Sequence, residues 1–168
     1  MITCGNQPTQ EQKNNLEGSE GSFPNLVSGE WSVTGSANSN YNCIAWSVGE
    51  TNVKYNDVHS DPANGWVGID EVYGNNNGTL ETSDMDAFYD AKGYVPTATG
   101  PEDADIMYYG KNPDGSGFHA ARKSSNPSCS TMYESKLGTY IKIDHVWNQL
   151  NGTGSGRYGS PTRFYKHK

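Results

Sequence analysis

The change from a helical to a strand pattern near residue 94 most constrains the fold of this chain. Residues 83–93, SDMDAFYDAKG, space their apolar side chains as one face of a helix. Residues 105–110 and 117–124 are short strand-like runs that flank an Asn-Pro-Asp-Gly turn, a pattern typical of an antiparallel hairpin. Helices followed by strands predict an α+β fold.

Further elements are predicted on either side of this hairpin. Ser83 is the expected N-cap of the helix, with Asp86 three residues later as in a capping box, and Gly93 ends it. Residues 131–138 and 139–143 are typical of two more strands, and the chain ends in another after a glycine-rich turn.

The remaining segments are less regular. Asp144 is suited to cap a short helix over residues 144–150, and residues 26–34 favour a strand or an irregular lead-in. Turn-forming residues crowd residues 51–78, which predicts a long surface segment. Its aromatic anchors would be Tyr55, Trp66 and Tyr73.

Length and polarity predict one folded domain behind a polar leader. The chain has 168 residues, the size of a single domain. Residues 1–25 contain few apolar side chains and are predicted to form a flexible leader, which leaves residues 26–168 as the domain. Only 33% of all residues are hydrophobic, so the eleven tyrosines and four tryptophans are expected to supply much of the core.

Charge and hydropathy exclude two classes of partner. The net charge is −7 and no cluster of Lys and Arg occurs, which argues against nucleic acid or an anionic membrane surface. No apolar run approaches the roughly 18 residues that a membrane span requires. No membrane span and no nucleic-acid partner are therefore expected.

Three cysteines, Cys4, Cys43 and Cys129, cannot all pair within the chain. A bridge between Cys4 and Cys129 would leave Cys43 free, but the sequence does not select it. Cys4 on a polar tether resembles the start of a processed bacterial lipoprotein. Location stays open: the cell surface or exterior if an export signal was removed, and the cytoplasm otherwise.

The stretch YNCIAWSVGE, residues 41–50, places Cys43 in the first turn of a predicted helix. Asn40 or Asn42 can cap this helix, and Gly49 ends it. The free N–H groups and the dipole of a helix start stabilise a thiolate. Cys43 is therefore either a nucleophile or a small buried packing residue.

His119 lies in a predicted strand about one domain's length after Cys43. A neighbouring imidazole raises the thiolate fraction of a cysteine and returns the proton to the leaving group. A third polar residue would hold the other ring nitrogen. Cysteine at a helix start and histidine on a later strand are the outline of a Cys–His hydrolase.

Several motifs occur together in a fixed order. They are NCIAWSVG (42–49), DMDAFYDAKGY (84–94), HAARKS (119–124), SKLG (135–138) and RYG (157–159). As a set they resemble an uncharacterised bacterial domain family whose arrangement is similar to that of papain-like, NlpC-type cysteine hydrolases. The resemblance covers about residues 41–165 and implies a papain-like fold, with N-terminal helices packed on an antiparallel sheet.

The resemblance implies roles for individual residues. Cys43 falls on the nucleophile position and His119 on the base position. Asn42 stands beside the nucleophile and, with Cys43, could donate to an oxyanion. The third role is open between Ser135, in the SKLG motif, and Glu134, where the family usually has a small hydroxyl residue.

Other polar residues have simpler interpretations. His145 matches a family histidine, but at a predicted helix start it favours a local hydrogen bond. Arg122 is expected to pair with an acidic residue of the sheet, and His59 to be solvated. The tract around His59 and Asp70 lacks the order of a calcium loop, so neither a metal nor a cofactor is expected.

Three functions fit these patterns. The first is a thiol hydrolase that acts on an amide of a peptide or protein, as a peptidase, an amidase or a deamidase. The second uses the same residues for acyl transfer or deamidation in a bacterial effector or toxin, with an immunity or inhibitor protein as partner. The third is a non-catalytic binding module on the same fold.

Overall fold

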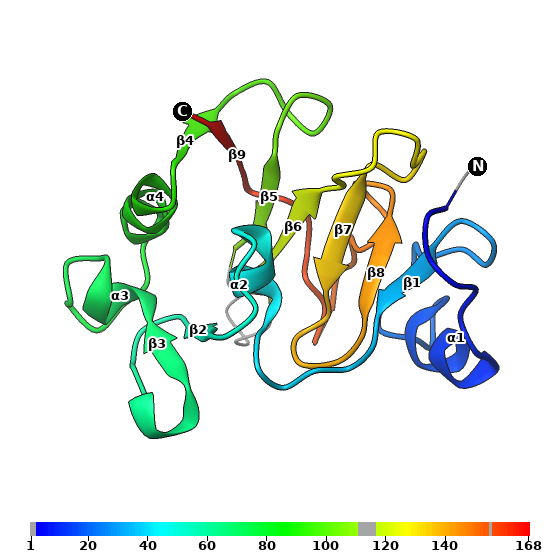
Figure 1. Ribbon diagram of the computed structural model, residues 1–168, viewed down its shortest axis with the longest axis horizontal. Helices are drawn as coiled ribbons and strands as arrows, with labels where there is room; N and C mark the ends of the chain where they lie inside the picture. The colour runs from blue at the N-terminus through cyan, green and yellow to red at the C-terminus, as the bar shows by residue number, and fades with distance from the viewer. Residues whose placement is uncertain (1–2, 111–116, 155) are drawn as a thin grey trace.

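A seven-stranded antiparallel sheet forms the centre of the computed structural model, which describes residues 3–110, 117–154 and 156–168 (Figure 1). The strand order is β1-β8-β7-β6-β5-β9-β4. The strands are Ser32–Gly35 (β1), Tyr94–Thr97 (β4), Ile106–Tyr109 (β5), His119–Lys123 (β6), Tyr133–Lys136 (β7), Lys142–His145 (β8) and Arg163–His167 (β9). The predicted mixture of helices with a large antiparallel sheet is confirmed.

Two hairpins build the middle of this sheet. In the predicted hairpin, β5 pairs with β6 and Tyr109 stands opposite His119; its predicted turn, residues 111–115, lies outside the described residues. In the second hairpin β7 pairs with β8, and Tyr133 stands opposite His145. Both histidines therefore lie on strands that flank β7.

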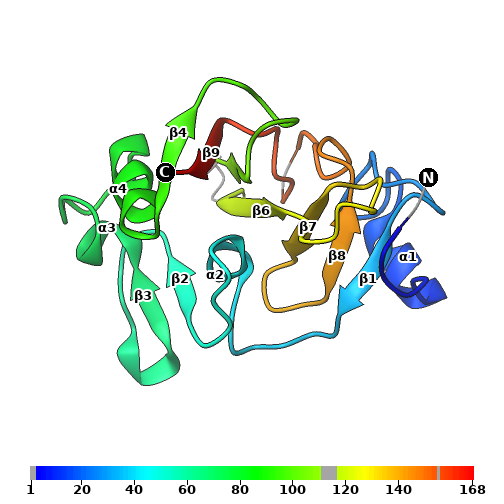
Figure 2. The same ribbon diagram turned by 45° about the horizontal axis from the view of Figure 1, so that its top comes forward.

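Short helices cover one face of the sheet. They are α2 (Cys43–Ser47), α3 (Ile69–Val72) and α4 (Thr82–Ala91). Figures 1 and 2 show α2 beside β6, with α3 and α4 at the end of the sheet that carries β4. The buried cluster on this face includes Ile44, Tyr55, Phe88, Ile106, Tyr108, Ala120 and Tyr165. As predicted from the composition, aromatic side chains supply much of this core.

The N-terminal segment covers the opposite face. It contains the helix α1 (Gln10–Leu16), which begins at a capping box of Thr9 and Gln12. Its apolar side chains meet those of β5 and β8 in a second buried cluster. The members include Leu16, Phe23, Leu26, Trp31, Tyr109, Ile143 and Leu150.

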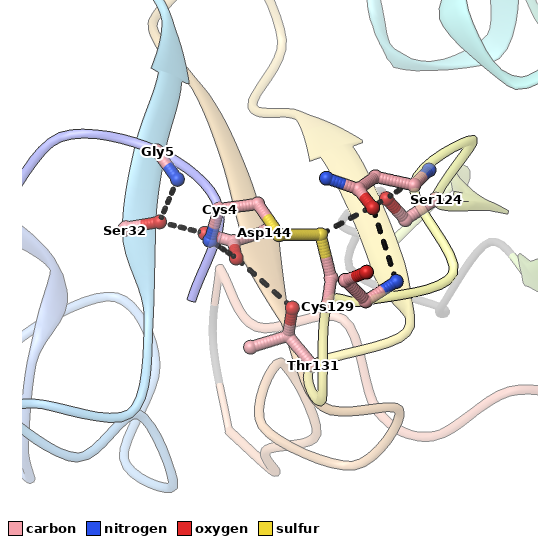
Figure 3. Close-up of a disulfide and its surroundings, with 9 residues drawn as sticks. Cys4, Gly5, Ser32, Ser124, Cys129, Thr131 and Asp144 are labelled. Atoms are coloured by element: carbon pink, nitrogen blue, oxygen red, sulfur yellow. Dashed lines mark hydrogen bonds between the residues drawn. A yellow bond between two sulfur atoms is a disulfide. The ribbon is translucent and has the colours of Figure 1, made fainter. Parts of the chain in front are cut away.

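A disulfide between Cys4 and Cys129 fastens this segment to the sheet (Figure 3). The backbone N–H of Cys4 also donates to a carboxylate oxygen of Asp144, at 2.8 Å. The flexible leader expected over residues 1–25 is wrong for its described part, because the few apolar residues there are buried and a bridge of 125 residues' separation holds its start. The pairing that the sequence left open is now assigned.

Two local expectations are corrected by buried carboxylates. The helix expected over residues 144–150 does not form, since Asp144 belongs to β8 and accepts from Ser32 and Thr131. In α4 the cap is Glu81 instead of Ser83, and it forms a capping box with Asp84. Gly93 does end that helix, with a φ of 96°.

Residues 51–78 are more regular than their turn content predicted. They contain β2 (Lys54–Asn56), a 3-10 turn η1 (Pro62–Asn64), β3 (Trp66–Gly68) and α3, and β2 pairs with β3 in parallel. Of the three expected aromatic anchors, Tyr55 is buried, with its ring 4.8 Å from that of Phe88. Trp66 and Tyr73 are half-buried. This segment is therefore packed on the helical face and is not a mere surface loop.

Candidate active site

The start of α2 is held by Asn42, as one of the two predicted caps. Its side-chain oxygen accepts from the backbone N–H groups of Ala45, at 3.3 Å, and Tyr55, at 3.1 Å. Its side-chain nitrogen donates to the Tyr55 carbonyl at 2.8 Å. Asn42 therefore fixes α2 against β2. Its side chain is engaged in these structural bonds, which leaves backbone N–H groups of α2 as the better oxyanion donors.

Cys43 is the first residue of α2 and its side chain is buried, with 7% of the residue exposed. The thiol donates to the carbonyl oxygen of Phe118, with Sγ 3.7 Å away. The backbone N–H groups of Ala120, Ile44 and Cys43 itself lie near the sulfur and favour the thiolate. Burial nevertheless raises the pKa of Cys43 to about 11. The resting thiol is therefore protonated at neutral pH.

The thiol occupies a place where two strands separate. Strands β6 and β7 pair through Arg122 opposite Glu134 and Lys123 opposite Tyr133, and no described pair continues toward the start of β6. Phe118 enters β6 with a φ of 49°, a left-handed conformation that non-glycine residues rarely adopt. The start of β6 thus leaves backbone groups on both sides of His119 free to contact Cys43.

His119 is fully buried and held by aromatic rings. Its ring stacks on that of Tyr158 at 4.3 Å and contacts that of Tyr109 at 5.3 Å. Nε2 lies 3.1 Å from the hydroxyl of Ser135 on β7. Nδ1 finds no hydrogen-bond partner within the described part of the chain. Burial, together with nearby His145, lowers the pKa of His119 well below its usual value, so the imidazole is neutral at pH 7.

The bond that would define a catalytic pair is not formed in this conformation. The described hydrogen bond of the Cys43 thiol runs to the carbonyl oxygen of Phe118, next to His119, and no described bond joins the sulfur to the imidazole. Strand alternation places the His119 ring on the face of Tyr109, whereas Ala120 packs under α2. The imidazole and the thiol therefore lie near the same short stretch of β6, but on opposite faces of the sheet.

Ser135 connects His119 to a second histidine. Its hydroxyl lies 2.7 Å from Nε2 of His145 on β8. The Nδ1 of His145 lies 2.8 Å from the carbonyl oxygen of Val146, so the predicted local hydrogen bond is present. Burial lowers the pKa of His145 to about 4. From the sequence His145 matched a family histidine and favoured a local bond, but its contact with Ser135 depends on the pairing of β7 with β8 and was not predicted.

Lys136 is a member of the site that sequence reasoning missed. It is fully buried, and its ammonium donates to the carbonyl oxygens of Asn38, Tyr41 and Gly138 at 2.8, 3.3 and 3.1 Å. It also lies 4.6 Å from the centre of the Tyr41 ring. Burial lowers the pKa of Lys136 to about 8, while its charge lowers that of Cys43. The lysine in the SKLG motif was the available signal.

Glu134 and Arg122 do not contact His119 in the described part of the chain. Glu134 points to the opposite face from Ser135, because the two are neighbours on one strand. The acidic partner predicted for Arg122 in the sheet is not found, since no ion pair among the described residues involves Arg122. Instead the Arg122 guanidinium lies 4.9 Å from the ring of Trp46. Ser135, and not Glu134, contacts His119.

The described cavities do not reach the thiol. A groove of about 610 Å³ lies between α1 and β1 and is lined by Thr9, Thr34 and Tyr140 among others. His59 is exposed, as predicted, and its ring bonds Glu71 at 3.0 Å. In the ranges that the structure describes, no cluster of three or more His, Cys, Asp or Glu side chains could hold a metal.

Comparison with known proteins gives one match. The profile described as "Domain of unknown function (DUF7689)" matches residues 32–166. The chain belongs to this family. No curated protein and no solved structure matches.

The DUF7689 match contains every residue of the candidate site, from Asn42 to Tyr158. Cys4, by contrast, lies outside the matched range, as does α1. The site therefore belongs to the part of the chain that defines the family. No helix among the described residues is long and apolar enough to cross a membrane.

Proposed function

We propose that this protein is a thiol hydrolase that acts on an amide bond, with Cys43 as nucleophile and His119 as base. One observation carries the proposal. Nδ1 of His119 is a buried ring nitrogen without a partner among the described residues, and the Cys43 sulfur contacts the backbone immediately before and after this histidine. A buried polar atom left unpaired is costly and requires an explanation.

The proposed reaction begins with a neutral pair. The Cys43 thiol releases the Phe118 carbonyl and transfers its proton to Nδ1 of His119 as the sulfur attacks the substrate carbonyl carbon. The carbonyl π electrons move to oxygen, and the N–H groups at the start of α2 stabilise that oxyanion. His119 then protonates the leaving nitrogen, the C–N bond breaks, and a thioester remains on Cys43. Water hydrolyses the thioester with His119 again as base.

In the resting conformation the thiol and the imidazole lie on different sides of β6, so the proposed sequence of events requires the substrate complex to bring them together. Hydrogen bonds of catalytic groups are often long or poorly aligned without substrate and tighten in the Michaelis complex. The packing of α2 against β6 and the contact between Ser135 on β7 and His119 support a papain-like arrangement. We infer that papain-like packing describes this domain.

The proposed substrate is an amide of a peptide or protein. The disulfide between Cys4 and Cys129 favours an oxidising compartment, where such bonds persist. A secreted or cell-surface location therefore fits better than the cytoplasm. In that location the substrate would be an external peptide or a cell-wall peptide, and an inhibitor or immunity protein would be a fitting partner.

A non-catalytic binding module is the second candidate. The exposed fraction of Cys43, 7%, and its pKa of about 11 favour it, because both are typical of a packed structural thiol. The two candidates differ in whether an acyl group ever reaches the sulfur.

The test is formation of an acyl-enzyme. The intact protein is incubated with p-nitrophenyl acetate, and the site of acetylation is read by mass spectrometry while nitrophenolate release is followed. The proposal expects acetyl on Cys43 and a rate at least roughly 10²-fold lower in His119→Ala. Cys43→Ala is the control for background acylation. Equal rates in the wild type and both variants would support the binding module.

A further inference from the structure

A chain of hydrogen bonds crosses three strands, from the backbone after β8 to His119 on β6. It starts at the carbonyl oxygen of Val146, which can only accept. Because that oxygen lies 2.8 Å from Nδ1 of His145, this nitrogen carries the proton. His145 is buried and neutral, so its Nε2 holds a lone pair.

The next hydrogen bond in the chain uses the single hydroxyl proton of Ser135. Its hydroxyl lies 2.7 Å from Nε2 of His145 and therefore donates to it. The same oxygen, with its donor now used, can only accept from the third group. That group is Nε2 of His119, at 3.1 Å, which must carry its proton. A neutral His119 then has its lone pair on Nδ1.

We infer that His145 and Ser135 form a relay that fixes His119 in the Nε2–H tautomer, and that His145 is a positioning residue for the candidate base. The relay leaves the lone pair on Nδ1, the ring nitrogen that has no partner among the described residues. Stacking on Tyr158 holds the ring plane, and the relay sets the proton. The catalytic use of this lone pair rests on the proposed function, whereas the tautomer does not.

The relay also explains why His119 takes one tautomer, which Ser135 and His119 alone would not determine. A serine hydroxyl can donate or accept, and against His119 alone it would permit either tautomer. The fixed polarity of the Val146 carbonyl, transmitted through His145, removes this freedom. An imidazole set in the wrong tautomer cannot accept a proton from a thiol at Nδ1.

The experiment is nitrogen NMR of the full chain with ¹⁵N-labelled histidine, at pH 7. Protonated and unprotonated ring nitrogens differ strongly in chemical shift, so each tautomer is read directly. Assignment uses His59→Asn and His167→Asn, which remove the histidines outside the relay. The inference expects Nε2–H for His119 and Nδ1–H for His145 in the otherwise unchanged chain. A proton on Nδ1 of His119 would overturn it.

A matched pair of variants tests the direction of the relay. His145→Gln can keep an acceptor oxygen near Ser135, and His119 should remain Nε2–H. His145→Ala frees the Ser135 hydroxyl to donate to His119, and the Nδ1–H form should gain population. No change of tautomer in folded His145→Ala would contradict the relay. If His145→Ala does not fold, the measurement on the wild type decides alone.

Activity separates this inference from the proposed function. An inactive protein with the expected tautomers overturns the hydrolase and leaves the relay intact. An active protein with Nδ1–H on His119 overturns the relay and leaves the hydrolase intact.

Discussion

The hydroxyl of Ser135 lies 3.1 Å from Nε2 of His119, and Glu134, its neighbour on the same strand, points to the other face of the sheet. The sequence left both as candidates for the third role. The prediction is that Ser135→Ala lowers the acylation rate of Cys43 by about tenfold or more, since an orienting group is lost. Glu134→Gln should leave that rate within about twofold. The rates come from p-nitrophenyl acetate kinetics, with thermal melting as the control for folding, and the reverse order would assign the role to Glu134.

Lys136→Met should raise the pKa of Cys43 further. The reason is that the Lys136 charge lowers this pKa in the native protein. The three carbonyl oxygens around the ammonium would also lose their donor, at a cost of about 3 kcal/mol in the free energy of unfolding. Ultraviolet titration of the thiolate measures the first effect and urea denaturation the second.

Lys142→Met is the matched control for this pair of effects, because Lys142 lies on the facing strand but is half-exposed. Its ammonium lies 3.8 Å from the centre of the Trp46 ring, so its removal should cost less than about 1 kcal/mol. Equal destabilisation by the two substitutions would show that the buried lysine has no special structural role.

Acid should destabilise the protein through His145. The folded pKa of about 4 lies below the unfolded value of 6.5, so the unfolded chain binds more protons as the pH falls. The destabilisation by His145 is therefore absent above pH 6.5, and the free energy of unfolding falls progressively from there down to about pH 4. The loss by then is about 3 kcal/mol for this one group.

Urea denaturation at pH 7 and pH 4.5 measures this slope in the wild type and in His145→Gln. The variant cannot take up the proton, so its loss between the two values should be smaller by about 2 kcal/mol. His59→Gln is the control, since this histidine is exposed. An unchanged slope in His145→Gln would mean that His145 is not buried as a neutral base.

The disulfide should stabilise the fold strongly. It joins residues 125 positions apart, and disulfides typically contribute about 2–4 kcal/mol, with long loops at the upper end. The double variant Cys4→Ser, Cys129→Ser should lose that amount in urea denaturation, and reductant should then have no further effect. Further loss in the double variant on adding reductant would contradict the assigned pairing.

Local signals in the sequence were sufficient for the elements near the site. The Asn42 cap, the glycine that ends α4 and the β5–β6 hairpin follow from turn chemistry and periodicity, and all are present. The order of helices before strands also predicted the antiparallel sheet. These features depend on interactions between residues close together in the chain, so the local sequence pattern is enough to predict them.

Long-range contacts account for what the sequence did not predict. The polar N-terminal segment folds because a few apolar residues and Cys4 find partners more than a hundred positions away. Asp144 and His145 favoured a helix start by local rules, yet β8 places one under the N-terminal segment and the other against Ser135. Burial of Lys136 likewise depends on carbonyl groups of a distant loop.

The proposed function requires that His119 activates the Cys43 thiol. The most direct measurement is the rate of Cys43 alkylation by iodoacetamide between pH 6 and pH 11, in the native protein and in His119→Ala. Because Cys4 and Cys129 are bridged, Cys43 is the one thiol of the chain that can react. If His119 activates the thiol, the folded protein is alkylated near neutral pH at a rate about tenfold or more above that of His119→Ala. Identical profiles that rise only toward pH 11, or reaction only after unfolding, would contradict it and make Cys43 a packing residue.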